Sequence, residues 1–226
     1  MKQSIRLDKY LANLGLIPRR QLKKLLKQWI ILINNIPARS WDQKLSLWDK
    51  IQILGVGEFE VKKDIHLLFY KPKGYVSTDV DEPNCPSYKN LLADYPYVNL
   101  VHAAWRLDCD AHWLLLLSSD GNFIHQIISP KSKVEKEYEV ELKDPITQPQ
   151  IDKLQKWVTL DDGYKTLPAQ VKLINPQKIK LTIHEGKYHQ VKRMLETVGN
   201  KVIDLKRIRI GQWELGNLKP GERQEI

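Results

Sequence analysis

Several features are missing from this chain of 226 residues, and each absence excludes a class of protein. No apolar run approaches the roughly 20 residues with which a helix crosses a bilayer, which argues against an integral membrane protein. The first residues contain no uninterrupted apolar core followed by a small-residue cleavage site, so we expect no secretory signal. We also find no glycine-rich phosphate loop and no cysteine–histidine cluster with zinc spacing, so we expect neither a cofactor nor a metal.

Cysteine is nearly absent as well. The two cysteines, Cys85 and Cys109, belong to no metal or disulfide motif, which favours a reducing compartment. Together with the missing secretory signal, this predicts a cytoplasmic protein.

Positive charge, by contrast, is abundant and concentrated in one part of the chain. Of a net charge of +9, residues 1–50 supply most, with eleven Lys and Arg against three Asp and Glu. The rest of the chain is nearly neutral, with 25 against 24. A basic segment on a neutral body is typical of a protein that binds a polyanion, and RNA is the leading candidate. An anionic membrane surface is the weaker alternative, because strand-like sequence follows the basic helix at once.

The basic segment is expected to form two helices and a hairpin. Leu7, Tyr10, Leu11 and Leu14 recur at helical spacing, and Pro18 suits the start of a second helix, RRQLKKLLKQ. The dipeptide Asn34-Asn35 after the strand-like IILIN suits a tight turn with positive φ. The second helix is strongly basic, and a merely solvated face is the alternative to RNA binding. Its candidate RNA-binding residues are Arg19, Arg20, Lys23, Lys24 and Lys27.

Residues 5–54 resemble the small RNA-binding domain of the small-ribosomal-protein-four type, the alpha-L motif. The resemblance rests on R-L-D-K-Y-L-A, on R-R and K-K in a helix, and on the hairpin. It implies that the basic helix lies against the phosphate backbone, with salt-sensitive and weakly sequence-selective affinity. We therefore expect an RNA-binding domain over 1–54, a linker over 55–65 and a second domain over 66–226.

The second domain mixes strands and helices. VEKEYEVEL alternates strictly, VKLINPQKIKLTI suggests two strands around an Asn-Pro turn, and YHQVKRMLETVGN suggests a helix with Gly199 near its end. Long alternating strands with a few helices predict an α+β fold with a mostly antiparallel sheet.

Residues 102–130, HAAWRLDCDAHWLLLLSSDGNFIHQIISP, contain the densest set of chemical groups. Arg106, Asp108 and Asp110 stand just before the apolar run 114–117. Two carboxylates and an arginine at the mouth of a buried strand indicate a site, although an ion pair that caps the strand is the alternative.

This block resembles the signature of the pseudouridine synthase family that modifies ribosomal RNA, in which R-L-D precedes a run of leucines and then D-G. Three further blocks resemble motifs of the same family: F-Y-K-P-K-G-Y-V (69–76), E-K-E-Y-E-V (135–140) and E-G-K-Y-H-Q-V-K-R-M (185–194). The combination H-A-A-x-R-L-D with Y-H-Q-V-K-R-M is most similar to the branch that acts on 16S RNA of the small subunit. The resemblance implies a monomeric, cofactor-free isomerase whose partner is ribosomal RNA.

By this resemblance Asp108 is the catalytic carboxylate, which attacks either the ribose or the uracil ring. Tyr138 lies on the apolar side of its expected strand and is a candidate for stacking on the uracil, the alternative being a core tyrosine. In the helix expected over 188–199 the apolar stripe is Tyr188, Val191, Leu195 and Val198. Lys192 borders this stripe, so we expect it to pair with Asp108, whereas a stripe-edge lysine in solvent is the alternative.

Four further residues are candidate RNA ligands. Arg193 is expected on the outer face of the same helix, against phosphate. Arg106 is expected to help displace the target base as the uridine is flipped into the pocket. Lys71 and Lys73 are candidate phosphate ligands, with a solvated turn as the alternative for both.

Glycine and tryptophan occur in unusual proportions. Glycine is low, at 11 of 226 residues, whereas the chain has seven tryptophans against three phenylalanines. Several tryptophans stand where the family usually has glycine, most clearly Trp105 and Trp113. One hypothesis is that UGA codons which the organism reads as glycine were translated as tryptophan. If the tryptophans are real and block the pocket, a non-catalytic RNA-binding or ribosome-assembly factor is the alternative function. The seven positions are Trp29, Trp41, Trp48, Trp105, Trp113, Trp157 and Trp213.

Overall fold

A computed structural model describes residues 5–28 and 30–226 of the chain. The chain divides into two compact units, one formed by Met1–Ile65 with Leu92–His102 and the other by His66–Leu91 with Ala103–Ile226. Among the described residues, no helix has both the length and the apolar character needed to cross a membrane.

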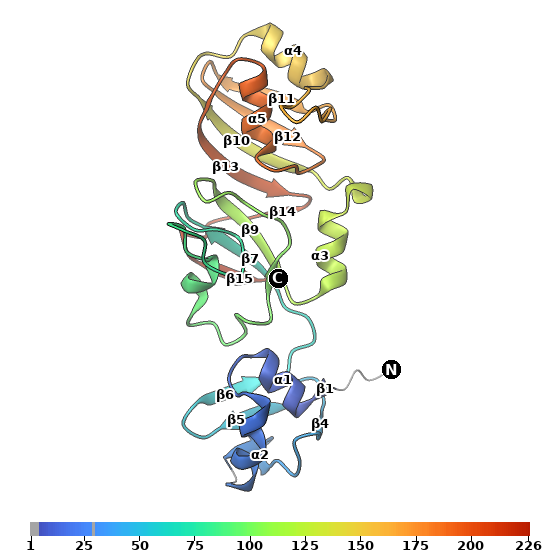
Figure 1. Ribbon diagram of the computed structural model, residues 1–226, viewed down its shortest axis with the longest axis vertical. Helices are drawn as coiled ribbons and strands as arrows, with labels where there is room; N and C mark the ends of the chain where they lie inside the picture. Colours follow the sequence, from blue (N-terminus) through green and yellow to red (C-terminus); the bar gives the residue numbers. More distant parts are fainter. Residues whose placement is uncertain (1–4, 29) are drawn as a thin grey trace. The chain divides into compact units, whose positions relative to one another are not determined.

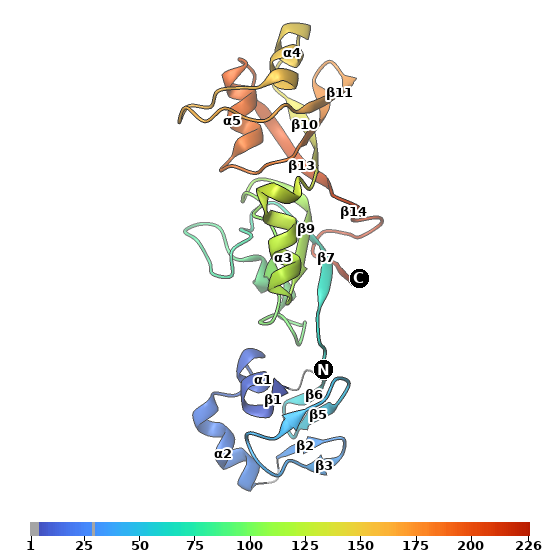
Figure 2. The same cartoon turned by 90° about the vertical axis from the view of Figure 1, so that its right-hand side faces the viewer.

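The first unit contains two helices and a small antiparallel sheet of order β3-β2-β5-β6 (Figures 1 and 2). The helices are α1 (Leu7–Asn13) and α2 (Arg19–Lys27), and the strands of the sheet are β2 (Ile31–Ile33), β3 (Ile36–Pro37), β5 (Lys50–Ile53) and β6 (Gly57–Glu60). A separate pair joins β1 (Ile5–Arg6) to β4 (Lys44–Leu45).

The predicted helix–helix–hairpin arrangement is confirmed. The four apolar residues expected on the inner face of the first helix are each at most 2% exposed. Asn34 and Asn35 form the turn between β2 and β3 with φ of +50° and +66°, the left-handed region that asparagine tolerates.

The linker expected over residues 55–65 is wrong. Gly57–Glu60 pairs with β5 as the edge strand β6, because the alternation of this segment turns Phe59 and Val61 into the core. The Tyr10 hydroxyl donates to the Glu60 carbonyl oxygen at 3.0 Å, which ties α1 to this strand. Residues 92–102 also belong to the first unit, where the Asn99 side chain donates to the Leu14 carbonyl oxygen at 3.0 Å.

The second unit contains a nine-stranded sheet whose main path is β11-β12-β10-β13-β9-β7-β15. Its strands are β7 (His66–Lys71), β8 (His102–Ala103), β9 (His112–Ser118), β10 (Lys136–Leu142), β11 (Gln170–Asn175), β12 (Lys178–Ile183), β13 (Val202–Ile210), β14 (Trp213–Glu214) and β15 (Arg223–Glu225). The described pairings along this path are antiparallel except that of β13 with β9, which is parallel. This confirms the α+β fold with a mostly antiparallel sheet.

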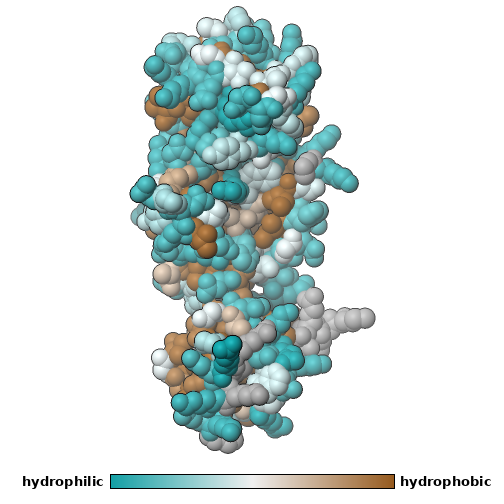
Figure 3. All heavy atoms as spheres, viewed as in Figure 1, coloured by the Kyte–Doolittle hydropathy of each residue, from teal (hydrophilic) through white to brown (hydrophobic). Residues whose placement is uncertain are grey.

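The helices of the second unit are α3 (Gly121–Ile128), α4 (Gln148–Lys156) and α5 (Gln190–Thr197), with two short 3-10 turns at Tyr88–Leu92 and Pro130–Ser132. Figures 1 and 2 show α5 against one face of the sheet where β10 and β13 run side by side. The core lies under these helices, and the four leucines of β9 (114–117) are fully buried. On the face drawn in Figure 3 hydrophilic residues predominate, and the apolar ones among the described residues form small separate groups.

Candidate active site

The loop that leads into β9 holds Asp108 at the surface of the sheet. Two hydrogen bonds fix its backbone, since Ser77 Oγ accepts from the Leu107 amide at 2.7 Å and donates to the Leu107 carbonyl oxygen at 2.9 Å. Ser77 and Leu107 are both buried, whereas the Asp108 side chain is 23% exposed. The carboxylate is therefore held by a rigid backbone at the edge of a solvent-accessible space.

Two side chains from the start of α5 contact this carboxylate. Lys192 Nζ lies 3.1 Å from Asp108 Oδ2, and His189 Nε2 lies 3.5 Å from Asp108 Oδ1. His189 reaches this position because it caps the helix with φ of +48°, a left-handed conformation in which the chain turns sharply into α5. The arrangement brings a carboxylate and two basic groups together.

Lys192 is shared between two carboxylates, because its Nζ also donates to Asp110 Oδ1 at 2.6 Å. Burial acts to lower the pKa of Lys192, but its hydrogen bond to Asp110 and the charge of Asp108 raise that pKa above its ordinary value. Burial likewise acts to raise the pKa of Asp110, and the hydrogen bond from Lys192 holds it below its ordinary value. Lys192 is thus a permanent cation beside Asp108.

Lys192 points towards Asp108, as expected from its place beside the apolar stripe. The expected start of the helix, however, is wrong. The helix begins at Gln190, not at residue 188, because His189 adopts the left-handed conformation. Tyr188 therefore lies outside the apolar stripe and is 71% exposed, while Val191, Leu195 and Val198 are buried as expected. The Tyr188 ring stacks on His189 with ring centroids 3.8 Å apart.

Arg193 points away from Asp108, as the helix spacing predicts, but it is not a bare cation. Its guanidinium pairs with Asp161 and with Asp162, the latter at 2.8 Å, in the segment that follows α4. A phosphate group that binds Arg193 must therefore compete with two exposed aspartates. Its role in RNA binding remains a prediction.

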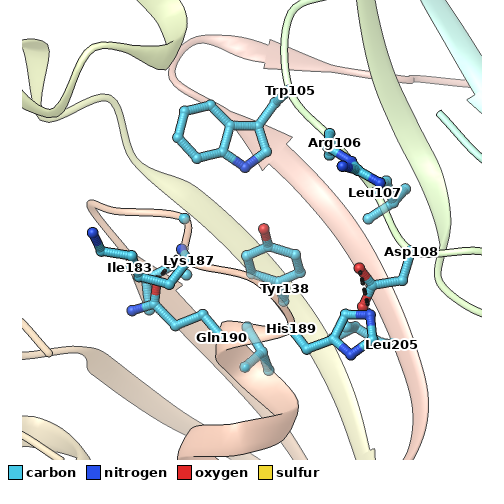
Figure 4. A pocket seen from close by; sticks show the side chains of 12 residues that line it. Trp105, Arg106, Leu107, Asp108, Tyr138, Ile183, Lys187, His189, Gln190 and Leu205 are labelled. Carbon is cyan, nitrogen blue, oxygen red and sulfur yellow. Dashed lines mark hydrogen bonds and ion pairs between the residues drawn. The ribbon is translucent and has the colours of Figure 1, made fainter. Parts of the chain in front are cut away.

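Tyr138 faces a small cavity next to Asp108. It lies on β10 with its ring 6% exposed, and the alternation that placed Tyr138, Val140 and Leu142 inward is confirmed. Figure 4 shows the Tyr138 hydroxyl pointing across the cavity towards the Trp105 indole, with Asp108 and His189 beside it. The cavity measures about 40 Å³, and a larger one of about 500 Å³ shares several of its lining residues.

Arg207 donates hydrogen bonds to the backbone on both sides of Asp108. It lies fully buried in β13, where Nε donates to the Leu114 carbonyl oxygen at 3.0 Å and Nη1 to the Arg106 carbonyl oxygen at 3.1 Å. Its Nη2 has no hydrogen-bond partner among the described residues. Burial lowers the pKa of Arg207 and raises that of Tyr138, while the charge of Arg207 opposes the rise at Tyr138. Arg207 thus fixes both ends of the segment that carries Asp108.

The expectation that Lys71 binds phosphate is wrong. Lys71 is 0% exposed, and its ammonium donates to the carbonyl oxygens of Pro72 and Tyr75 at 3.0 and 2.6 Å. Lys71 is the last residue of β7, and the turn that follows the strand covers its side chain. Burial, with the charge of Arg207, lowers the pKa of Lys71 to about 7.

Lys73 and Arg106 are exposed, so contact with RNA remains a prediction for both. Lys73 pairs with Asp204, which also accepts from His112 at 3.1 Å. Arg106 lines both cavities with a side chain that is 73% exposed and lies 3.5 Å from Glu82. Arg106 is thus positioned at the entrance to the site.

The basic helix α2 presents Arg20, Lys24 and Lys27 to solvent. The side chains of Arg19 and Lys23 lie outside the described part of the structure. The RNA-binding role of all five residues remains a prediction.

The expectation of two unpaired cysteines is wrong, because the structure pairs Cys85 with Cys109, with Cα atoms 6.4 Å apart. The residues are 24 positions apart, and no motif connects them in the sequence. The bond ties the loop around Cys85 to the residue that follows Asp108.

Two family models match the chain. Residues 65–197, more than half of the chain, match the model described as RNA pseudouridylate synthase, and residues 5–47 match that of the S4 domain. The chain belongs to the RNA pseudouridine synthase family. It is therefore an isomerase, and the family that the sequence motifs resemble is confirmed.

Curated relatives match this synthase over its full length. The ribosomal small subunit pseudouridine synthase A of Pasteurella multocida is 38% identical over 98% of this chain and 96% of its own. The ribosomal large subunit pseudouridine synthase B of Bacillus subtilis is 32% identical over 98% of this chain and 91% of its own. A crystal structure of a pseudouridylate synthase is 34% identical and covers 99% of this chain and 96% of that chain, with a TM-score of 0.69.

Sequence reasoning missed two residues of the synthase site. His189 lies three positions before Lys192, a spacing that places both near one side of a helix start, but a lone histidine carried no other signal. Arg207 shares the inward side of β13 with Leu205, and a basic residue among inward apolar ones was the available sign.

The assignment of Lys192 and Arg193 can be tested with two matched substitutions. Lys192→Met and Arg193→Met each remove one charge and keep an apolar stem. Lys192→Met should lower turnover roughly 100-fold, because the Asp108 carboxylate loses the cation that contacts it. Arg193→Met should leave turnover nearly unchanged. The measurement is turnover at saturating RNA for both variants, and the opposite pattern would exchange the two roles.

The buried Lys71 should make stability depend on pH. Its folded pKa of about 7 lies below the ordinary 10.5, so the unfolded chain binds more protons between these values. Stability from this group therefore rises with pH through that window and is lost as pH falls towards 7. Urea unfolding at pH 7, 8 and 9 should show the parent gaining stability relative to Lys71→Met. The exposed Lys172→Met is the control, and a parallel trend for both variants would contradict the assignment.

Proposed function

We propose that this synthase isomerises a uridine to pseudouridine in 16S ribosomal RNA, with Asp108 as the nucleophile. The observation that carries the proposal is the contact of Asp108 with Lys192 beside a cavity lined by Tyr138. A carboxylate can act as the nucleophile in covalent catalysis, and here it has a cation as its neighbour.

Ribosomal RNA is supported by the names of the relatives, which act on the small or the large ribosomal subunit. The 16S molecule is favoured within that class. The small-subunit enzymes of Pasteurella multocida and Vibrio cholerae are each 38% identical to this chain, against 32% for the large-subunit enzyme.

The chemistry assigns a role to each group around the cavity. The N1–C1′ glycosidic bond breaks, the uracil rotates, and C5 bonds to C1′; C5 then loses its proton and N1 gains one. Asp108 initiates this by attack on C1′ or on the uracil ring. Lys192 supplies a positive charge beside the carboxylate, and Tyr138 stacks on the base or assists through its hydroxyl.

RNA reaches the site in two steps. The basic helix α2 holds the phosphate backbone, a contact that depends on charge more than on sequence. The target uridine then leaves its helix, since the reacting atoms are inaccessible in a stacked base. Arg106, exposed at the cavity entrance, helps to displace or replace that base.

Release of tritium from RNA labelled at uracil C5 tests the substrate assignment. Transcripts of 16S RNA should release label, whereas 23S transcripts at equal concentration should release little. Release from the 23S transcript alone would contradict the 16S assignment but would still support pseudouridine synthase activity.

Asp108→Asn should abolish tritium release, because it removes the nucleophile at almost constant volume. Asp110→Asn is the matched control, since Asp110 also contacts Lys192 but has no proposed covalent role. Residual turnover above a few per cent in Asp108→Asn, with deamidation excluded by mass spectrometry, would rule out Asp108 as the nucleophile. Binding of RNA should be nearly unchanged in both variants.

Replacement of Arg20, Lys24 and Lys27 by Gln should weaken RNA binding and flatten its salt dependence. Loss of three phosphate contacts should reduce the slope of log affinity against log salt by about 2. The control replaces three exposed lysines of the second unit, Lys153, Lys156 and Lys172. An unchanged slope in the α2 variant, or an equal change in the control, would move the main RNA surface away from α2.

A further inference from the structure

Two tryptophans have backbone conformations that belong to glycine. Trp48 has φ of +71° and Trp113 has φ of +91°. The other described non-glycine residues with positive φ are asparagines, a lysine and a histidine, all between +48° and +66° and thus close to the left-handed helical region. The two tryptophans lie instead among glycines such as Gly15 at +74° and Gly74 at +84°. Bulky residues are outliers in this region, whereas glycine adopts it freely.

The side chain of Trp48 offers little to offset this strain. It is 69% exposed, while its backbone N–H donates to the Val61 carbonyl oxygen at 2.8 Å. The hydrogen bond needs the backbone but not the indole.

Trp113 is different, because its ring packs 4.5 Å from that of Tyr70. Its backbone nevertheless sits in β9 between Lys71 of β7 and Arg207 of β13, with a φ that is foreign to a regular strand. Glycine at such a position marks a local irregularity in a strand.

A third tryptophan presents a problem of space. The Trp105 indole lies so close to Gly186 that a Cβ added to that glycine would meet Trp105 Cζ2 at 1.7 Å. Trp105 lines both cavities, and it stands opposite the Tyr138 hydroxyl in Figure 4. The indole therefore borders both the cavity at Tyr138 and the larger one.

The cavity at Tyr138 is smaller than a base in this arrangement. Its 40 Å³ correspond to about three water molecules, which is less than a uracil ring with its oxygens requires. The adjoining cavity of about 500 Å³ reaches Asp108 and Arg106 but not Tyr138. We expect the two spaces to join when the indole is removed, because Trp105 lines both of them.

We infer that glycine is the natural residue at Trp48, Trp105 and Trp113, encoded by UGA codons that the source organism reads as glycine. Glycine would relieve the backbone strain at positions 48 and 113 and would remove the indole between the two cavities at position 105. Glycine would also bring the composition from 11 to 18 glycines if all seven tryptophans are replaced, about 8% of the chain. The part of this inference that concerns Trp105 rests on the proposed function, and the other two positions do not.

A codon rule acts on every copy, so the inference extends to the remaining four tryptophans. Trp41, Trp157 and Trp213 are described without positive φ, and Trp29 lies outside the described residues. The prediction for these four therefore rests on the code and not on their conformation.

Peptide mass spectrometry of the protein purified from its own organism tests the inference directly, together with the codons of its gene. We expect glycine and UGA at all seven positions. Tryptophan or a UGG codon at position 48, 105 or 113 would overturn the inference at that position, and a mixture of both residues over the seven would overturn the codon rule.

Stability measurements on the recombinant chain separate backbone strain from loss of the ring. Trp48→Gly relieves the positive φ, whereas Trp48→Ala removes the ring and keeps a Cβ. The Gly variant should melt about 2–4 °C above the Ala variant. At Trp157, whose φ is −172°, the order should reverse, because glycine only adds chain entropy there. An Ala variant at least as stable as Gly at position 48 would contradict the strain argument.

Activity tests the divided cavity. Trp105→Gly should raise tritium release from 16S RNA at least tenfold over the parent chain, while Trp157→Gly, at an exposed site, should leave it unchanged. A parent chain already as active as Trp105→Gly would overturn the claim that the indole blocks the pocket. Glycine at position 105 in the natural protein, combined with an inactive Trp105→Gly chain, would instead contradict the proposed function and leave the inference standing.

Discussion

The contact between Lys192 and Asp108 is the interaction on which the rest of the site depends. It joins the loop before β9 to the first turn of α5, two segments that the sheet brings together through β13. β13 pairs with β9 in parallel, the exception in an otherwise antiparallel path, and it follows α5 in the chain. Because α5 precedes β13 in the chain and β9 pairs with β13, the start of α5 lies close to the loop that leads into β9. Arg207, on β13 itself, adds hydrogen bonds to the backbone on both sides of Asp108.

The site gathers several basic side chains around one carboxylate. Lys192 and His189 contact Asp108, while Lys71 and Arg207 lie fully buried nearby, and the charge of Asp108 acts to raise the pKa of both buried groups. Burial of uncompensated cations is costly, so the pKa values of Lys71 and Arg207 are lowered and their N–H groups donate to backbone carbonyl oxygens.

Periodicity and motif predicted most of the fold and the centre of the site. The alternation of VEKEYEVEL placed Tyr138 inward, and helical spacing gave Lys192 its direction towards Asp108. What failed depended on contacts between segments far apart in sequence or on single backbone dihedrals. Lys71 is buried because a turn folds over its ammonium, residues 57–60 form a strand because β5 offers them an edge, and the left-handed His189 shortens α5. The pairing of Cys85 with Cys109 likewise requires the three-dimensional position of a loop.

We propose that this synthase has one carboxylate nucleophile, a basic helix that holds RNA and a 16S target. Pseudouridine mapping in ribosomal RNA from cells with and without the gene tests that claim most directly. The account predicts that a single 16S pseudouridine disappears on deletion, returns with the parent gene and stays absent with the gene encoding Asp108→Asn. An unchanged 16S map on deletion, a loss confined to 23S RNA, or rescue by Asp108→Asn would contradict it.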